Sequence, residues 1–309
     1  MKVKTKTKEI QHSGIKTNGE KIGQIIMTLI LALLAFACLY PFLIILSSSF
    51  QSQETIVNNG YKVLTNAYTL DAYKMIFANP TAIANAYKTT IIVTVATVAI
   101  GTFVTSMGGY VMSRKDYAYR HILSYYVFFC MLFSGGMVPS YILISRWLHL
   151  KDSIWAMILP MCVSAWNLIL MKGFFAGLPK ELIESAKIDG AGEFRIFLQI
   201  IAPISKAGIA TIALFLTLGT WNDYMQGLLY IDTESKFPLQ YLLMKIMANI
   251  DFLNSEEAMQ YGAVKAGQEI PTYGARMAMC ILAAGPIVVL FPFFQKYFTK
   301  GLTVGSVKG

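Results

Sequence analysis

The charged side chains that could carry chemistry gather in one short segment of a largely apolar chain, from Leu178 to Pro203. In and just beyond this segment the charges balance: Lys180, Lys187, Arg195 and Lys206 against Glu181, Glu184, Asp189 and Glu193. A segment that binds nucleic acid should be basic, so we expect no nucleic-acid partner. Its carboxylates can instead accept charge-assisted hydrogen bonds. The charge pattern by itself favours an ordinary solvated loop between apolar stretches.

A second group combines aromatic rings with an amide and an acid, in the run Trp221, Asn222, Asp223 and Tyr224. Aromatic faces beside hydrogen-bonding groups suit the binding of a sugar. The competing interpretation is structural, because Trp and Tyr are common at membrane interfaces and an acid can also join two subunits. We treat these four residues as a candidate substrate pathway, with the structural role left open.

Catalytic and metal-binding patterns are missing from the sequence. It contains no GxxxxGK[ST] phosphate loop, HExxH helix or nucleophile elbow. The histidines and cysteines are scattered without a common spacing: His12, His121 and His149, with Cys38, Cys130, Cys162 and Cys280. The cysteines are therefore predicted to be small buried side chains rather than disulfide or metal partners. We expect no catalytic residue, no metal site and no cofactor in this chain.

Two short helices should position the charged segment. Pro179 fits a first helical position, where its missing N–H is not needed. Gly190 can adopt the positive φ at which a helix stops. Apolar residues recur at helical spacing on both sides of that turn: Leu182, Ile183 and Ala186, then Phe194, Phe197, Leu198 and Ile201. The sequence predicts a helix-turn-helix elbow over residues 178–203.

The composition predicts an all-α polytopic membrane protein. Apolar residues make up 55% of the chain and charged residues 14%, far below the roughly 25% charged residues of soluble domains. A transmembrane helix needs about 20 apolar residues. Six windows qualify, at about 24–47, 89–112, 121–145, 153–171, 207–231 and 276–296. The predicted domains are a basic N-terminal tail over 1–21, a transmembrane domain over 22–300 and a C-terminal tail over 301–309.

Basic residues predict the orientation of these spans. The N-terminal tail, the 114–120 turn, the stretch from 172 to 206 and the C-terminal stretch from Lys296 hold 17 of the 26 Lys and Arg residues. Because basic loops stay inside, both termini and the elbow should be cytoplasmic. The external segments are then about 47–87 and 232–275. An apolar patch at 239–250 in the second is predicted to be a short helix at the membrane interface or packed on a partner.

An energy source must come from outside this chain. A transporter coupled to protons or sodium needs ionisable groups within its spans, and only Asp223 qualifies. The economical source is an ATPase engaged through the elbow. The elbow sequence supports this, since Glu184-Ser185-Ala186, Asp189-Gly190-Ala191 and the later Ile200 and Pro203 resemble the EAA loop of ATP-binding-cassette (ABC) importer permeases. Ser185 replaces the usual alanine, a small residue for a small one.

The resemblance extends over most of the chain. The six spans, the Trp221 to Tyr224 run and the ending FQKYF followed by GLTVGSVKG look like the carbohydrate-uptake permeases of the maltose type. The segments FPLQYLL and PTYGARMAM look more like the lipoprotein-linked oligosaccharide permeases. The match is specific in the elbow and the C-terminal tail and loose in the first two spans.

The resemblance implies a type I importer in a bacterial plasma membrane. This chain would pair with a second, non-identical permease and sit on two copies of a cytoplasmic ABC ATPase, which binds ATP and Mg. An extracellular, often lipid-anchored, binding protein would deliver a sugar or oligosaccharide. The implied ATPase-coupling residues are Glu184, Ser185, Ala186, Asp189, Gly190 and Ala191. The implied ATPase-interface tail contains Gly301, Gly305, Lys308 and Gly309.

Two alternatives to a sugar permease remain open. A type I permease for amino acids, polyamines or phosphate would share the elbow but should lack the GLTVGSVKG tail. A membrane scaffold that transports nothing would have no reason for an Asp-Gly elbow.

Overall fold

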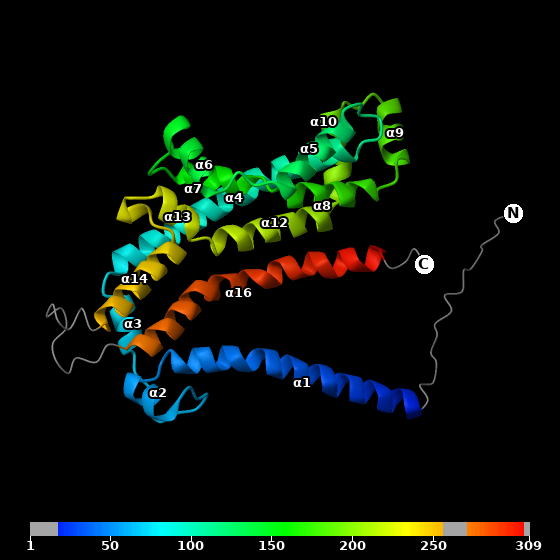
Figure 1. Ribbon diagram of the computed structural model, residues 1–309. Coiled ribbons are helices and arrows are strands. Elements are labelled where there is room, and N and C mark those ends of the chain that lie inside the picture. The colour runs from blue at the N-terminus through cyan, green and yellow to red at the C-terminus, as the bar shows by residue number, and fades with distance from the viewer. Residues whose placement is uncertain (1–17, 256–270, 306–309) are drawn as a thin grey trace.

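The computed structural model describes residues 18–255 and 271–305, and this part of the chain is helical (Figure 1). The first half contains α1 (Asn18–Ser48), α2 (Gln53–Asn59), α3 (Asp71–Ile76), α4 (Pro80–Ser113), α5 (Arg120–Leu132), α6 (Met137–Ile142), the π-helical turn η1 (Leu143–Trp147), α7 (Ile154–Cys162) and α8 (Ala165–Ala176). The second half contains α9 (Glu181–Ile188), α10 (Glu193–Ile196), the π-helical turn η2 (Phe197–Ile201), α11 (Ala202–Ile204), α12 (Lys206–Trp221), α13 (Met225–Tyr230), the 3₁₀ turn η3 (Glu234–Lys236), α14 (Leu239–Leu253) and α16 (Thr272–Gly305).

Three single helices of the described chain are long and apolar enough to cross a membrane: α1, α4 and α16. Three bent pairs of helices bring the total to as many as six spans. This confirms the predicted all-helical membrane fold. The predicted windows 24–47, 89–112 and 276–296 lie within α1, α4 and α16.

Three of the predicted spans are not continuous helices. The window 121–145 breaks after Leu132, and α5 and the following α6–η1 helix differ in direction by 110°. Gly136 lies in this break with a φ of 87°, a conformation that ends a helix. The window 207–231 also breaks, because α12 ends at Trp221 and a separate helix, α13, begins at Met225. The window 153–171 becomes α7 and α8, which meet at a 44° bend.

The core of the fold forms where α4 packs against α7, α8 and α12. Small residues permit this close packing, as at Gly101, where an added Cβ would lie 2.6 Å from the carbonyl oxygen of Cys162. The predicted helix at 239–250 is α14, and its side chains Leu239, Leu243 and Ile250 are buried in a core shared with α16 and Trp221. One face of this helix therefore packs against the core of this chain.

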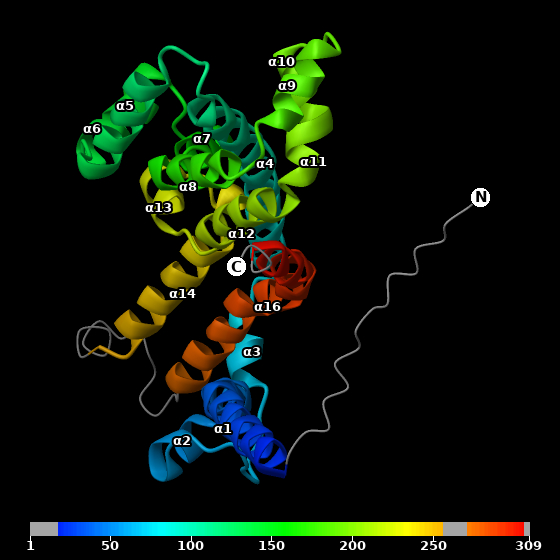
Figure 2. The same ribbon diagram turned by 90° about the vertical axis from the view of Figure 1, so that its right-hand side faces the viewer.

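The elbow and both described ends of the chain lie at the same end of the molecule. In Figure 1 the beginning of α1, the end of α16 and the α9–α10 elbow all point to the right, while α2, α3 and α14 lie at the opposite end. Figure 2 looks at that end and shows the elbow standing apart from α1 and α16. This arrangement is the one that the basic-residue pattern predicts for a single side of the membrane.

Candidate functional site

The elbow turns at Gly190, whose φ is 75°. The amide of Gly190 donates to the carbonyl of Lys187, and the amide of Ala191 donates to the carbonyl of Ala186, both at 3.0 Å. These two bonds are the pair that closes a helix in a Schellman motif, in which a left-handed residue follows the helix and small apolar residues flank it. Gly190, Ala186 and Ala191 are thus explained by the turn itself. The helix starts at Glu181, two residues later than the predicted position of Pro179.

The outer surface of α9 and its last turn combines carboxylates with one exposed large apolar side chain. Glu184, Ser185 and Asp189 are exposed, whereas Ala186 is buried. Ile188 is 86% exposed. It lies off the apolar stripe of α9, and the sequence analysis missed it for that reason. An apolar residue outside the stripe, at the end of a charged helix, is the signal that could have found it.

A closed ring of ion pairs fixes the base of the elbow, and we call it the bracket: Arg114, Asp116, Lys187 and Glu193, with the Tyr110 hydroxyl beside them. Lys187 Nζ lies 2.8 Å from Asp116 Oδ2 and 2.9 Å from Glu193 Oε1. Arg114 contacts both carboxylates from the opposite side. Arg114 and Lys187 hold the pKa of the Asp116 carboxyl well below its usual range, so the ring stays charged at neutral pH. The bracket joins the end of α4 to both helices of the elbow.

Three aromatic rings continue the bracket into the core. Tyr110 of α4 packs against Phe175 of α8 and Phe197 of η2, with ring centroids 6.0 and 5.5 Å apart. Phe197 opens a π-helical turn just before Pro203, whose missing N–H and bulky ring disturb a regular helix. The chain then bends by 85° at Ser205 into α12. The elbow is thereby connected to α4, α8 and α12.

The Trp221 to Tyr224 group divides into structural and exposed side chains. Trp221 is buried, and its Nε1 donates to the carbonyl of Ala283 at 2.8 Å, which ties α12 to α16. Asp223 Oδ2 accepts the amide of Gln226 at 2.9 Å and so caps the start of α13. Asn222 donates to the Leu218 carbonyl of its own helix. Tyr224 lines a pocket.

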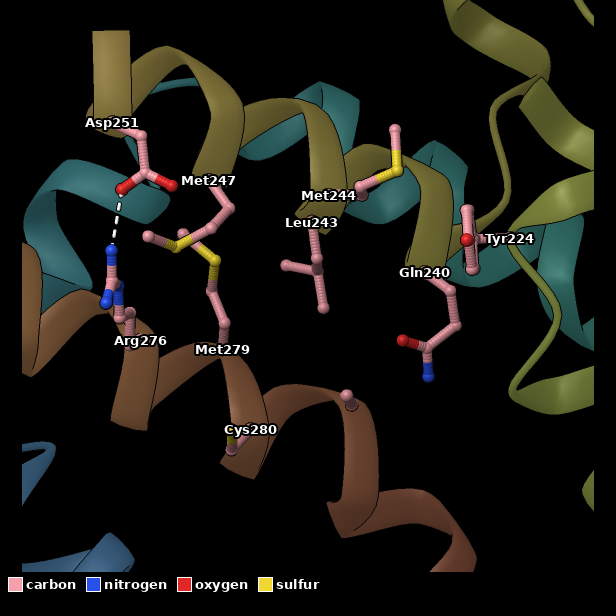
Figure 3. Close-up of a pocket in the computed structure, with 10 residues that line it drawn as sticks. Tyr224, Gln240, Leu243, Met244, Met247, Asp251, Arg276, Met279 and Cys280 are labelled. Atoms are coloured by element: carbon pink, nitrogen blue, oxygen red, sulfur yellow. Dashed lines mark hydrogen bonds and ion pairs between the residues drawn. The ribbon is translucent and has the colours of Figure 1, made fainter. Parts of the chain in front are cut away.

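That pocket lies between α14, α16 and the start of α13 and has a volume of about 430 Å³. Figure 3 shows Tyr224 and Gln240 at one end and the ion pair of Asp251 with Arg276 at the other. The intervening lining is apolar and rich in methionine: Leu243, Met244, Met247, Met279, Cys280 and Ala283. An aromatic ring and an amide beside a flexible apolar wall can contact both the apolar and the hydroxyl faces of a solute.

Other predicted residues fall outside these two sites. Gly301 and Gly305 belong to α16, which continues beyond the predicted span, whereas Lys308 and Gly309 lie outside the described residues. The prediction of four buried cysteines is wrong, because only Cys162 is buried, while Cys38, Cys130 and Cys280 are exposed in this chain. Cys280 lines the pocket between α14 and α16. All four have free thiols.

Comparison with known proteins gives one consistent result. Residues 18–304 match the family described as "Binding-protein-dependent transport system inner membrane component". Protein LplC of Bacillus subtilis is 37% identical, with 96% of this chain and 99% of the relative covered. The polygalacturonan/rhamnogalacturonan transport system permease protein YtcP of the same species is 38% identical, over 90% and 96% of the two chains.

A solved structure has the same fold. The crystal structure of a bacterial ABC transporter involved in the import of the acidic polysaccharide alginate contains a chain with a TM-score of 0.73 and 27% identity. The match covers 91% of this chain and 98% of that one. The chain therefore belongs to the family of binding-protein-dependent inner membrane components, the permease subunits of ABC importers, and is a transport subunit rather than an enzyme.

Proposed function

We propose that this chain forms half of the pathway by which an ABC importer moves a sugar or oligosaccharide across a bacterial cell membrane. The observation that carries the substrate class is the similarity, over nearly the whole chain, to YtcP, whose name specifies polygalacturonan and rhamnogalacturonan. Relatives named for arabinooligosaccharides and maltodextrin, at 27–29% identity, support the same class. The alternatives, a permease for amino acids or polyamines and a scaffold, have no such support.

The partners follow from the same proposal. A second, non-identical permease completes the pathway, two copies of an ABC ATPase bind ATP and Mg on the cytoplasmic side, and a lipid-anchored extracellular protein delivers the solute. Glu184, Ser185, Asp189 and Ile188 face the ATPase from the elbow, and the tail from Gly301 to Gly309 enters the ATPase interface. Ala186, Gly190 and Ala191 give the elbow its shape.

An uptake experiment on the reconstituted complex tests the substrate class. Liposomes containing both permeases and the ATPase are supplied with the binding protein, ATP and one labelled solute at a time. The solutes are maltodextrin, arabinooligosaccharide, oligogalacturonate, an amino acid and a polyamine. We expect ATP-dependent uptake of at least one of the three sugars. Uptake confined to the amino acid or the polyamine would replace the proposed substrate class, and no uptake of any solute would favour the scaffold.

Glu184 should contribute to ATPase binding. Loss of a hydrogen bond to a charged group costs about 1.5–3 kcal/mol, so Glu184→Ala should weaken retention of the ATPase by about tenfold to a hundredfold. Glu181→Ala is the matched control, because Glu181 is exposed in the first turn of the same helix. Retention is measured by copurification of the ATPase with the permease pair.

The same copurification tests the contribution of the C-terminal tail to ATPase binding, with a chain truncated after Lys300. We expect the truncated chain to retain less ATPase than the full chain. Equal retention by Glu184→Ala, Glu181→Ala and the unaltered chain would remove Glu184 from the interface. If the truncated chain retained as much ATPase as the full chain, the tail would not belong to the interface.

Variants of Tyr224 and Asp223 should distinguish a residue that contacts the solute from a residue that stabilises the fold. Tyr224→Ala removes the ring that lines the pocket and should raise the KM for sugar uptake by about tenfold, the effect of losing about 1.4 kcal/mol of binding.

Asp223→Ala removes a helix cap, which costs about 1 kcal/mol of stability, and should lower the melting temperature without raising the KM. Asp223→Asn keeps an oxygen for the Gln226 amide and should change neither. If Asp223→Asn raised the KM for sugar uptake and Tyr224→Ala did not, the substrate contact would be assigned to Asp223 instead of Tyr224.

A further inference from the structure

The bracket connects parts of the chain that lie far apart in the sequence. Arg114 follows the last residue of α4, Lys187 lies in the last turn of α9 and Glu193 is the first residue of α10. Each ion of the ring contacts two ions of opposite charge, because Asp116 and Glu193 each lie between Arg114 and Lys187. Such a network has a lower entropic cost for each pair than separate pairs have, since every side chain is already held by its other partner.

Arg114 occupies the centre of this network in a way that only arginine can. Its side chain is 10% exposed. One fork of the guanidinium, Nε and Nη2, binds the Asp116 carboxylate. The other, Nη1 and Nη2, binds the Glu193 carboxylate at 3.1 and 3.2 Å, and Nη1 also donates to the Tyr110 hydroxyl at 2.6 Å. A lysine carries the same charge but lacks the planar fork, so it cannot hold both carboxylates in this geometry.

The second part of the elbow is held by buried apolar side chains, among them Ile196, Phe197 and Ile201, but α9 has little apolar packing of its own. Ala186 is the only buried side chain of α9, and it is small. A force applied near Ile188, at the far end of α9, would therefore tilt this helix on its turn unless ionic contacts resisted it. The bracket supplies such contacts, and it attaches them to α4, a helix of 34 residues that packs against α7, α8 and α12.

We propose that the bracket is a rigid joint that carries the movement of the elbow into α4, and that Arg114 is its positioning residue. The proposal rests on the proposed docking of the elbow onto an ATPase. Arg114 contacts neither ATP nor the solute in this role. It keeps the angle between the elbow and α4 fixed, so that a displacement of α9 becomes a displacement of the pathway helices. Without the joint, ATP hydrolysis would continue while the elbow moves by itself.

The variant Arg114→Lys tests the joint in the complete reconstituted complex. We expect the complex to assemble and to hydrolyse ATP when the loaded binding protein is added, while the sugar moved per ATP hydrolysed falls by about tenfold. Glu193→Gln removes a carboxylate charge from the elbow side and should lower the same ratio. It replaces Arg114→Lys in the experiment if that variant fails to assemble. The matched control is Asp71→Asn, which breaks the exposed pair of Asp71 and Lys74 on α3 and should leave this ratio unchanged.

A distance measurement gives a readout that does not depend on the solute. Spin labels are attached at Gly192→Cys on the elbow and Tyr117→Cys on the segment after α4, after replacement of the four native cysteines. Gly192 has no atom within 4 Å of an added Cβ, and Tyr117 is exposed. We expect a narrow distance distribution that ATP does not change, and a broad one in Arg114→Lys. The proposal would be overturned if Arg114→Lys kept both the unaltered amount of sugar moved per ATP and a narrow distance distribution. Where Arg114→Lys fails to assemble, the same result in Glu193→Gln would overturn it. If the unaltered complex moved no sugar, the proposed substrate would fail, and the label distances would still decide on the joint.

Discussion

Gly190→Val should strongly reduce solute uptake while leaving the transmembrane helices folded. Gly190 has a φ of 75°, and a β-branched residue at positive φ is a genuine outlier. Backbone strain of this kind costs about 1–3 kcal/mol. Relief of the strain would open the two hydrogen bonds that close α9, and the elbow would then point elsewhere. Uptake should fall by about thirtyfold or more, with the ATPase lost in copurification.

Two neighbouring variants make this a test of backbone conformation rather than of side-chain size. Gly192→Val places the same side chain two residues later, at a φ of −71° with no atom within 4 Å of the new Cβ, and should support normal uptake. Gly190→Asn should retain most uptake, because asparagine tolerates the left-handed region. Normal uptake by Gly190→Val, or equal losses in both valine variants, would contradict the role of the turn.

Gly101→Val should prevent the core of the permease from packing. A Cβ at this position would lie 2.6 Å from the backbone carbonyl oxygen of Cys162 and 2.9 Å from Leu216 Cδ1. The first contact is with backbone at the end of α7, which cannot rotate away as a side chain can. Overpacking of this kind costs typically 1–3 kcal/mol and occasionally more, and the two extra methyl groups add to it. We expect a low folded yield and a clearly reduced melting temperature in detergent.

The control for Gly101 is a second glycine within a packed helix. Gly219 of α12 has no atom within 4 Å of an added Cβ, and valine has a higher helix propensity than glycine. Gly219→Val should therefore fold as well as the unaltered chain. Thermal unfolding monitored by size-exclusion chromatography compares the two, and a Gly101→Val protein as stable as Gly219→Val would show that α4 and α7 can separate at little cost.

Local patterns were sufficient to predict the elbow and its turn. The Asp-Gly pair, the apolar spacing around it and the absence of apolar continuity across it are all encoded within residues 178–203. The bracket was not predictable in the same way. Tyr110 and Arg114 lie some 80 positions before Glu193, and nothing in either segment marks the other as its partner. Contacts of that separation depend on how the helices pack.

The broken spans show what an averaged apolar window leaves out. The Gly135-Gly136 pair interrupts the apolar window 121–145 without lowering its hydropathy much, so the window reads as one helix although the structure bends there. The sequence marks Asp223 as an ionisable group within a span, but its role as a cap that starts a new helix depends on the amide of Gln226. Length and apolarity predict that a segment can enter the membrane, whereas glycines and local caps decide whether it continues.

The ion pairs at the base of the elbow and the exposed residues on its outer surface are largely separate, and this separation bears on how such a permease can acquire a different ATPase. All the ion pairs at the base of the elbow are formed between residues of this chain, while Glu184, Ser185, Ile188 and Asp189 on its outer surface contribute no ion pair to that base. Substitutions at Ser185, Ile188 and Asp189 can therefore accumulate without disturbing the attachment to α4, whereas Glu184 lines a groove together with Arg114, Asp116 and Lys187. On the proposed docking of the elbow, such a permease can be adapted to a different ATPase, by selection or by engineering, through a few surface exchanges on α9.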